Sequence, residues 1–283
     1  MGNRDPKFDF DPQWSLRDGN RVGWQIRAEI SPKWIRVKFG GVTIADSKRV
    51  LIVTETGKLP VYYFHQSDVR TDLFERSKKR VFDPNKGEAF YWNIKVGDTV
   101  IEDAAWSFHN PPEKSSVIEG YLAFVWKKAD VWYEEEEEVF VHPRDPYSRL
   151  DAIPSSRHVQ VVLNGEVVAD SKQPVILYET GLTPRYYLPK EDIRMDLFFP
   201  NDTQTQCPYK GYAKYWTASI NGKEYKDIVW SYQDPLPEVH EIKGLLSFYN
   251  EEVDSILIDG EKWTLHPKDR LPYKKIVEQS NKK

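Results

Sequence analysis

Cysteine is nearly absent from this sequence, since Cys207 is the only one among 283 residues. A single thiol excludes an internal disulfide framework and any zinc site built from several cysteines. The sequence also has no apolar run near the ~20 residues that a membrane-spanning helix needs. Residues 1–11 lack the apolar stretch of a signal peptide. These absences predict a soluble, cytoplasmic protein without a membrane partner.

Neither sign of charge dominates, because 40 Lys and Arg stand against 44 Asp and Glu, giving a net charge of −4. A mildly acidic chain has no overall electrostatic footprint for nucleic acid, so we expect no nucleic-acid partner. Neither common type of glycine-rich phosphate loop is present. Of the 6 histidines, only His142 and His266 stand at equivalent positions of the repeat described next. We therefore expect no metal site and no histidine-based triad.

A tandem repeat organises the chain. Residues 41–48 match residues 165–172, an offset of 165 − 41 = 124 positions. The same offset carries Glu-Thr-Gly at 55–57 onto 179–181, Tyr-Tyr at 62–63 onto 186–187, Tyr-Trp at 91–92 onto 215–216, and Trp-Ser at 106–107 onto 230–231. Each copy has the size of an ordinary domain, which is too long for a solenoid repeat. Each copy is therefore expected to have a core of its own.

The repeat predicts where the domains lie. We expect an N-terminal extension over residues 1–34, a first domain over 35–145, and a linker rich in Pro, Asp, Ser and Arg over 146–158. A second domain over 159–269 and a basic C-terminal tail over 270–283 complete the chain.

Secondary-structure signals are overwhelmingly those of β-strands. Asn164-Gly165, Asn221-Gly222 and Asp259-Gly260 separate short β-branched runs and predict hairpins, the first through a type I′ turn. The one helical candidate is short and covers residues 192–198, with Asp192 as its N-cap. The run Glu134 to Glu138 is expected to form a solvated hairpin tip. The fold class is therefore all-β, with two tandem antiparallel domains that each hold at most one short helix.

Each copy repeats a set of polar and aromatic residues that strand packing alone does not require. In the second copy they are Glu179, Tyr187, Arg194, Cys207, Lys210, Trp216 and Trp230. In the first copy they are Glu55, Tyr63, Arg70, Lys86, Trp92 and Trp106, with Asp83 at the position of the cysteine.

These residue types can line a ligand pocket. Arg and Lys suit a carboxylate or phosphate, and Trp and Tyr faces can stack on a ring. We expect Arg194 and Lys210 to anchor an anion, with Glu179 as acid, base or hydrogen-bond acceptor. The alternative is that Glu179 pairs with Arg194 or Lys210 as a structural ion pair and that the tryptophans belong to the core. Lys210 could also lower the pKa of Cys207 and make it a nucleophile, although a lone cysteine is more often unreactive.

The second copy carries these residues within a series of short motifs. They are Gly165–Ser171, Glu179-Thr-Gly, Pro184-Arg-Tyr-Tyr, Asp192–Leu197, Cys207-Pro-Tyr-Lys and Trp230–Pro235. Together they resemble the domain of unknown function 427, a nucleotidyltransferase-like family. The first copy departs from the pattern at Asp83-Pro-Asn-Lys86. The resemblance implies a tandem duplication of a compact all-β unit of the β-tent type. That type includes zinc-binding domains with paired Cys-x-x-Cys ligands, which this chain lacks.

The expected function is binding of a small polar or anionic ligand, with a nucleotide-like molecule as one candidate, in a pocket of each domain. One alternative is an enzyme of the nucleotidyltransferase type, for which Mg²⁺ would be the cofactor. The other is a structural or protein-interaction module without a ligand.

Overall fold

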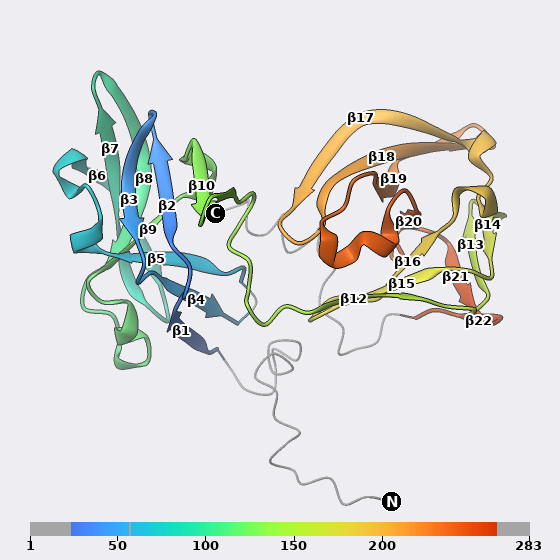
Figure 1. Cartoon of the computed structure of the whole chain (residues 1–283), viewed down its shortest axis with the longest axis horizontal. Coiled ribbons are helices and arrows are strands. Elements are labelled where there is room, and N and C mark those ends of the chain that lie inside the picture. The colour runs from blue at the N-terminus through green and yellow to red at the C-terminus, as the bar shows by residue number, and fades with distance from the viewer. Residues whose placement is uncertain (1–23, 57, 265–283) are drawn as a thin grey trace, which may run out of the picture. The chain divides into compact units, whose positions relative to one another are not determined.

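A computed structural model describes residues 24–56 and 58–264 of the chain. The chain divides into two compact units that part between Asp145 and Pro146. We call the described residues before this point the first unit and those after it the second unit (Figure 1). The tail predicted over residues 270–283 lies outside the described residues, as do positions 1–23 of the predicted extension.

The first unit consists of two antiparallel sheets. The larger has the strand order β1 (Ile26–Ile30), β4 (Leu51–Glu55), β5 (Val61–His65), β9 (Tyr121–Phe124), β8 (Thr99–Phe108), β7 (Gly87–Val96) and β6 (Phe74–Asp83). The smaller has the order β11 (Glu137–Glu138), β10 (Val131–Glu134), β2 (Ile35–Phe39) and β3 (Val42–Ser47). The short 3₁₀ helices η1 (Gln66–Asp68), η2 (Thr71–Leu73), η3 (Glu113–Ile118) and η4 (Trp126–Lys128) lie in the connections.

The second unit repeats this arrangement strand by strand. Its larger sheet has the order β12 (Leu150–Pro154), β15 (Val175–Glu179), β16 (Arg185–Leu188), β20 (Leu246–Phe248), β19 (Lys223–Tyr232), β18 (Gly211–Ile220) and β17 (Phe198–Cys207). Its smaller sheet has the order β14 (Glu166–Ser171), β13 (Val159–Leu163), β21 (Ser255–Ile258) and β22 (Glu261–Lys262). The 3₁₀ helices are η5 (Lys190–Asp192), η6 (Met195–Leu197) and η7 (Pro237–Ile242). The predicted all-β tandem fold is confirmed.

Alternation of side chains along the strands gives each seven-stranded sheet two apolar faces. In β15, Ile176 points into a core that also contains Val161 of β13 and Ile256 of β21, so this core lies between the two sheets. The neighbouring residues Val175 and Leu177 point to the opposite face, which we call the outer face, and join a second cluster. The first unit has the same two clusters. The larger sheet is therefore buried on both sides.

The predicted hairpin turns are confirmed by their backbone angles. Asn164 and Gly165 have φ values of 53° and 77°, and Gly40 and Gly41 have 56° and 76°. Two consecutive positive φ values are the mark of a type I′ turn, whose twist matches the flanking strands.

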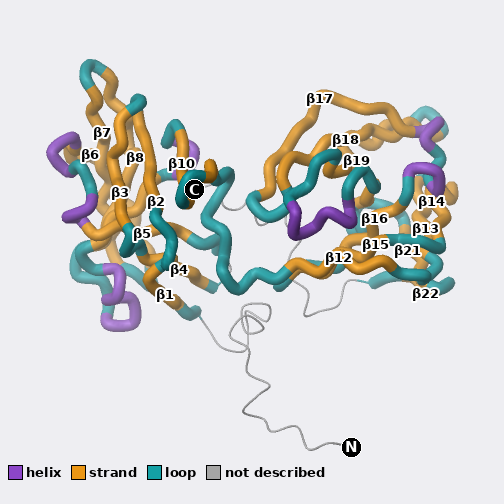
Figure 2. The backbone as a smooth tube through the Cα atoms, viewed as in Figure 1, coloured by secondary structure: helices purple, strands orange, loops and turns teal. Residues whose placement is uncertain are grey.

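The predicted helix over 192–198 is replaced by the two 3₁₀ turns η5 and η6, after which Phe198 already pairs with Ala218 in the sheet (Figure 2). Asp192 ends η5, and its carboxylate accepts a hydrogen bond from Ser171 Oγ at 2.7 Å. The segment is too short for an α-helix because sheet pairing begins at its end. None of the helical segments described is long and apolar enough to cross a membrane.

Strands also occur in segments expected to be an extension and a linker. β1 lies within residues 1–34 and pairs with β4, and β12 lies within 146–158 and pairs with β15. Each larger sheet therefore begins before residues 35 and 159.

The glutamate run forms the predicted hairpin between β10 and β11. Glu134 departs from the expected solvated tip, because it is buried, accepts a hydrogen bond from Tyr62 OH at 2.7 Å and pairs with Lys33.

Candidate functional site

A buried lysine–glutamate pair lies on the outer face of each larger sheet. In the second unit, Glu179 ends β15, and Lys210 occupies the turn between β17 and β18. Gly211, which follows Lys210, has a φ of 94°, and a Cβ at this position would lie 3.4 Å from the carbonyl oxygen of Asp234. Glycine is therefore the residue that lets this turn place Lys210 beside Glu179.

The second-unit pair is short and sheltered from solvent. Lys210 Nζ donates to Glu179 Oε2 at 2.5 Å, and each side chain is 10% exposed. Burial alone would lower the pKa of Lys210, but the carboxylate of Glu179, to which its ammonium group donates, raises it overall. Burial raises the pKa of the Cys207 thiol, so the thiol is protonated at neutral pH and Glu179 supplies the charge that faces the ammonium. Cys207 is therefore unsuited to the nucleophilic role weighed for it.

Two aromatic side chains border this pair. Trp230 Nε1 donates to Tyr187 OH at 3.1 Å, and the two rings meet edge to face with centroids 6.3 Å apart. Burial is the main cause of the raised pKa of Tyr187, and the charges of Lys210 and Glu179 also act on it. Tyr187 thus links the Lys210–Glu179 pair to Trp230.

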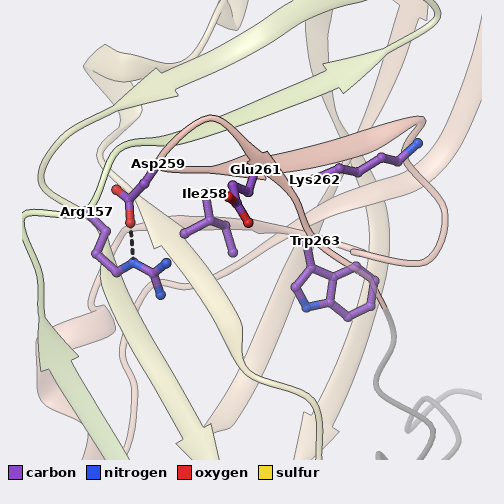
Figure 3. Close-up of a pocket in the computed structure, with 6 residues that line it drawn as sticks. All are labelled: Arg157, Ile258, Asp259, Glu261, Lys262 and Trp263. Carbon is purple, nitrogen blue, oxygen red and sulfur yellow. Dashed lines mark hydrogen bonds and ion pairs between the residues drawn. The ribbon is translucent and has the colours of Figure 1, made fainter.

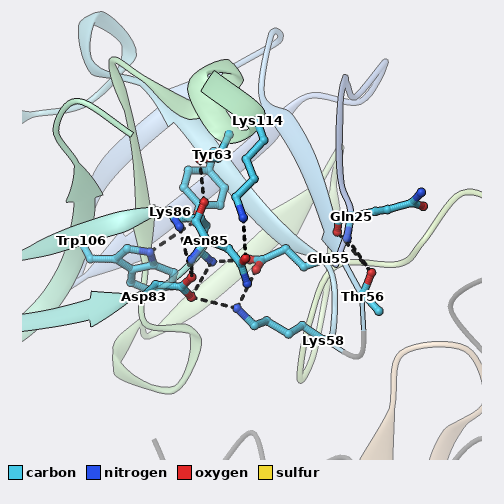
Figure 4. A network of polar contacts seen from close by, with 11 residues as sticks. Gln25, Glu55, Thr56, Lys58, Tyr63, Asp83, Asn85, Lys86, Trp106 and Lys114 are labelled. Carbon is cyan, nitrogen blue, oxygen red and sulfur yellow. Dashed lines mark hydrogen bonds and ion pairs between the residues drawn. The ribbon is translucent and has the colours of Figure 1, made fainter. Parts of the chain in front are cut away.

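The first unit has the same core arrangement. Lys86 Nζ donates to Glu55 Oε1 at 2.5 Å, with side-chain exposures of 7% and 5%, and Trp106 Nε1 donates to Tyr63 OH at 3.4 Å. Two further charges join it (Figure 4). Lys58 Nζ donates to Glu55 Oε2 at 2.6 Å and to Asp83 Oδ2 at 3.2 Å.

The extra charges of the first unit replace an apolar pair in the second. At the offset of 124, Lys58 corresponds to Leu182 and Asp83 to Cys207. Both oxygens of Glu55 therefore accept hydrogen bonds from lysines. Glu179 accepts one on Oε2, and its Oε1 accepts none from the described residues. Burial lowers the pKa of Lys86 despite the opposing charge of Glu55, whereas Lys210 has a raised pKa.

The predicted arginine anchors lie elsewhere. The side chain of Arg194 is 50% exposed and pairs with Glu166 at 3.2 Å and Asp196 at 3.0 Å. Arg70 forms two hydrogen bonds to Asp72, at 2.9 and 2.8 Å. The structure therefore gives both arginines local surface partners and does not join them to the buried pairs.

Two of the predicted tryptophan walls face the other side of the sheet. Trp216 packs against the core between the sheets, whereas its neighbour Tyr215 belongs to the outer-face cluster. Trp92 packs in the same way in the first unit and donates to Ser107 Oγ at 3.1 Å. The predicted set thus splits: Glu179, Tyr187, Cys207, Lys210 and Trp230 lie on the outer face, as do Glu55, Tyr63, Lys86 and Trp106 in the first unit.

Polar residues found in the second unit alone enlarge its site. Arg185 forms two hydrogen bonds to Glu251, at 2.8 and 2.9 Å, and its guanidinium carbon lies 5.7 Å from the Trp230 ring centroid and 5.9 Å from that of Tyr249. The first unit has Val61, Lys127 and Val125 at these three positions of Arg185, Glu251 and Tyr249. Because these residues do not recur in both copies, the sequence repeat gives no signal for them.

The second unit also has an open hollow of about 390 Å³, lined by Arg157, Ile258, Asp259, Glu261, Lys262 and Trp263 (Figure 3). This hollow includes none of the predicted site residues. Arg157 Nε donates a hydrogen bond to Asp259 Oδ2 at 2.7 Å. Within residues 24–56 and 58–264, no three or more His, Cys, Asp or Glu side chains are grouped so that they could hold a metal ion.

The family model of a domain of unknown function, DUF427, matches residues 27–135 and again residues 151–259. The two matches cover most of the chain and follow the two units. No curated protein matches the chain.

Proposed function

Because the chain is a tandem member of the DUF427 family, we propose a function from the arrangement that its two repeats share: the second unit binds a small polar ligand at the Glu179–Lys210 pair. The observation that carries the proposal is the unequal pairing of two equivalent glutamates, of which Glu55 is buried and Glu179 is partly buried. Glu55 is saturated by Lys58 and Lys86, whereas Glu179 keeps one oxygen uncommitted beside a lysine whose ammonium group has three donors.

The equivalent position in the first unit is proposed to bind no ligand. Its four charges, those of Lys58, Lys86, Glu55 and Asp83, satisfy one another within 3.6 Å. A ligand would have to displace one of these bonds and would leave a buried charge unpaired, which costs several kcal/mol. A single functional site per chain is therefore proposed, in place of one pocket in each domain.

A buried ion pair alone would support a structural module equally well, because such pairs also occur as plain packing elements. The Oε1 of Glu179 favours binding over that alternative, because it accepts no hydrogen bond from the described residues and a ligand donor can occupy it without breaking a bond within the protein. The nucleotidyltransferase alternative gains no support from the described residues, because no three or more of their His, Cys, Asp and Glu side chains are grouped as metal ligands.

The test is a thermal-shift panel of nucleotides, amino acids, sugar phosphates and small carboxylates, with and without Mg²⁺. A ligand at 100 times its Kd adds about 2.7 kcal/mol to the free energy of unfolding, which raises Tm by several degrees. The decisive variant is Leu182→Lys with Cys207→Asp, which gives the second unit the charges of the first. The backbone permits this exchange, because Leu182 N donates to Glu179 O at 2.9 Å just as Lys58 N donates to Glu55 O at 3.0 Å.

The closing variant is expected to fold and to lose the ligand-induced shift. Its matched control, Leu182→Met with Cys207→Ser, adds no charge and is expected to keep the shift. No shift with any compound would move the assignment to a structural or interaction module. A hit that requires Mg²⁺ and a nucleotide, and that is turned over, would favour the transferase.

A further inference from the structure

The second unit buries three polar oxygen atoms without a hydrogen-bond partner among the described residues: Thr183 Oγ1, Ser247 Oγ and Asn250 Oδ1. The residues that carry them are 3%, 0% and 4% exposed. The first unit has Leu59, Ala123 and Trp126 at the corresponding positions. A buried oxygen atom without a partner destabilises a fold, so the polar residues at these three positions, which are apolar in the first unit, require an explanation.

Ser247 lies in the candidate site. It pairs across the sheet with Tyr187 on one side and with Trp230 on the other, so these three side chains share the outer face. The hydrogen bond from Trp230 to Tyr187 therefore joins the two residues that flank Ser247.

The other two oxygens lie beside the strand that carries Tyr187. Asn250 Nδ2 donates to the carbonyl oxygen of Pro184 at 3.1 Å, and Thr183 directly precedes Pro184. Arg185 comes next in the chain, stacks over Trp230 and binds Glu251. Ser247 therefore lies beside Tyr187, and Thr183 and Asn250 lie next to the start of β16, the strand that carries Tyr187.

The atoms of this site that have no hydrogen-bond partner among the described residues are mostly acceptors. Asn250 Oδ1 and Glu179 Oε1 can only accept hydrogen bonds, while the hydroxyls of Thr183 and Ser247 can accept or donate. A ligand that satisfies them must supply several N–H or O–H donors. A carboxylate alone cannot do this, because it only accepts hydrogen bonds at neutral pH, and a phosphate group has too few O–H donors.

The fixed charges of the site cancel. Lys210 pairs with Glu179, and Arg185 pairs with Glu251 through side chains that are 15% and 17% exposed. A ligand with a net charge would leave that charge unbalanced in a sheltered site, which is costly. The guanidinium of Arg185 lies over the rings of Trp230 and Tyr249, so these two aromatic side chains already accommodate a cationic group.

We propose that the ligand of the second unit is a zwitterion of the α-amino-acid class, neutral overall, with an ammonium group that donates to the uncommitted oxygens and a carboxylate that accepts from Lys210. This inference rests on the proposed function and names its ligand class. It replaces a simple anion or nucleotide by a molecule with a donor group and an acceptor group side by side.

The experiment measures thermal shifts with the free amino acids and, for each hit, with the matching amine that lacks the carboxylate and the matching acid that lacks the amine. The proposal expects a shift with the amino acid and a much smaller one with either analogue. Equal shifts with the acid analogue, or hits confined to nucleotides and phosphates, would leave the binding function standing and overturn the ligand class. Silence across all compounds would overturn both.

Ser247→Ala and Thr183→Leu provide variants that resemble the first unit. Each removes an unpartnered hydroxyl, so Tm without ligand is expected to stay level or rise, while Kd for the amino acid rises about tenfold. A lower Tm together with an unchanged Kd would contradict the inference, because it would mean that the hydroxyl is satisfied within the protein. Ser171→Ala is the control, since its buried hydroxyl already binds Asp192 and lies in the smaller sheet; it is expected to lower Tm and leave Kd unchanged.

Discussion

At the scale of single residues, Lys86 and Lys210 decide what the outer face of each sheet can do. Each is buried against a glutamate at 2.5 Å, but only Glu55 has a second lysine. The identity of the two pairs follows from the sequence repeat. Their burial does not, because it depends on the turn after β6 or β17 and on the clusters packed around it.

Lys210→Met is expected to destabilise the second unit by about 3–5 kcal/mol, because it leaves the Glu179 carboxylate buried without its partner. Urea denaturation measures the effect. Lys86→Met is the comparison and should cost less, since Lys58 still pairs with Glu55. Equal losses in both variants would mean that Lys58 contributes nothing.

Tyr186 gives the second unit a sensitivity to alkali. Burial, as the main cause, raises its pKa from 10.0 to about 12. The unfolded chain therefore releases this proton first, so the stability contributed by the neutral phenol is complete below pH 10 and is lost as the pH rises toward 12. Tyr186→Phe should flatten the decline in the free energy of unfolding between these pH values. An unchanged decline, followed by denaturation at several pH values, would assign it to other groups.

At the scale of elements, the strands and hairpins could be predicted because their signals are local. Period-two runs and the Asn-Gly, Asp-Gly and Gly-Gly turns specify the pairing of β2 with β3, β13 with β14, β18 with β19 and β21 with β22. The edge strand β12 was missed, because it precedes the repeat's strongest matches. The predicted helix over residues 192–198 is wrong because the pairing of Phe198 in the sheet, a non-local contact, overrides the local preference for a helix.

The turns that carry the buried lysines are sensitive to their glycines. Gly211→Ala should cost about 1–2 kcal/mol, because a φ of 94° is strained for alanine and the new Cβ meets the Asp234 carbonyl oxygen at 3.4 Å. Gly87→Ala in the first unit should cost less, since its nearest neighbour, Pro112 Cδ, is 3.7 Å away. Chemical denaturation of both variants compares them, and a larger loss for Gly87→Ala would contradict this account of the turn.

The site itself could be predicted only in part. The recurring residues Glu179, Tyr187, Lys210 and Trp230 share one face, as a ligand site requires. Arg194 belongs to the same repeated pattern but follows the 3₁₀ turns out to the surface, where Asp196 and Glu166 bind it. The presence of a residue in both copies thus shows common origin. Which of these residues lie together depends on the face of the strand from which each side chain points.

At the scale of the whole molecule, each unit has its own pair of apolar clusters and its own two sheets. A fragment of residues 146–264 is therefore expected to fold alone. A fragment that begins at residue 159 lacks β12, whose Leu150 and Ala152 pack on the outer face, and should be less stable. Circular dichroism with thermal melting tests both, and equal melting temperatures would mean that the sheet does not need β12.

The two units have kept one fold and diverged in chemistry. The first uses Lys58 and Asp83 to close its buried pair, and the second has Leu182 and Cys207 at those positions and additional polar groups around Trp230. The central claim is that this difference leaves one binding site in each chain.

Isothermal titration calorimetry of the full-length protein with a compound found by thermal shift tests that claim most directly, because it counts sites. The account predicts one molecule bound per chain, and none after Leu182→Lys with Cys207→Asp in a protein that keeps its fold. Two molecules per chain, or one that the double substitution leaves in place, would contradict it.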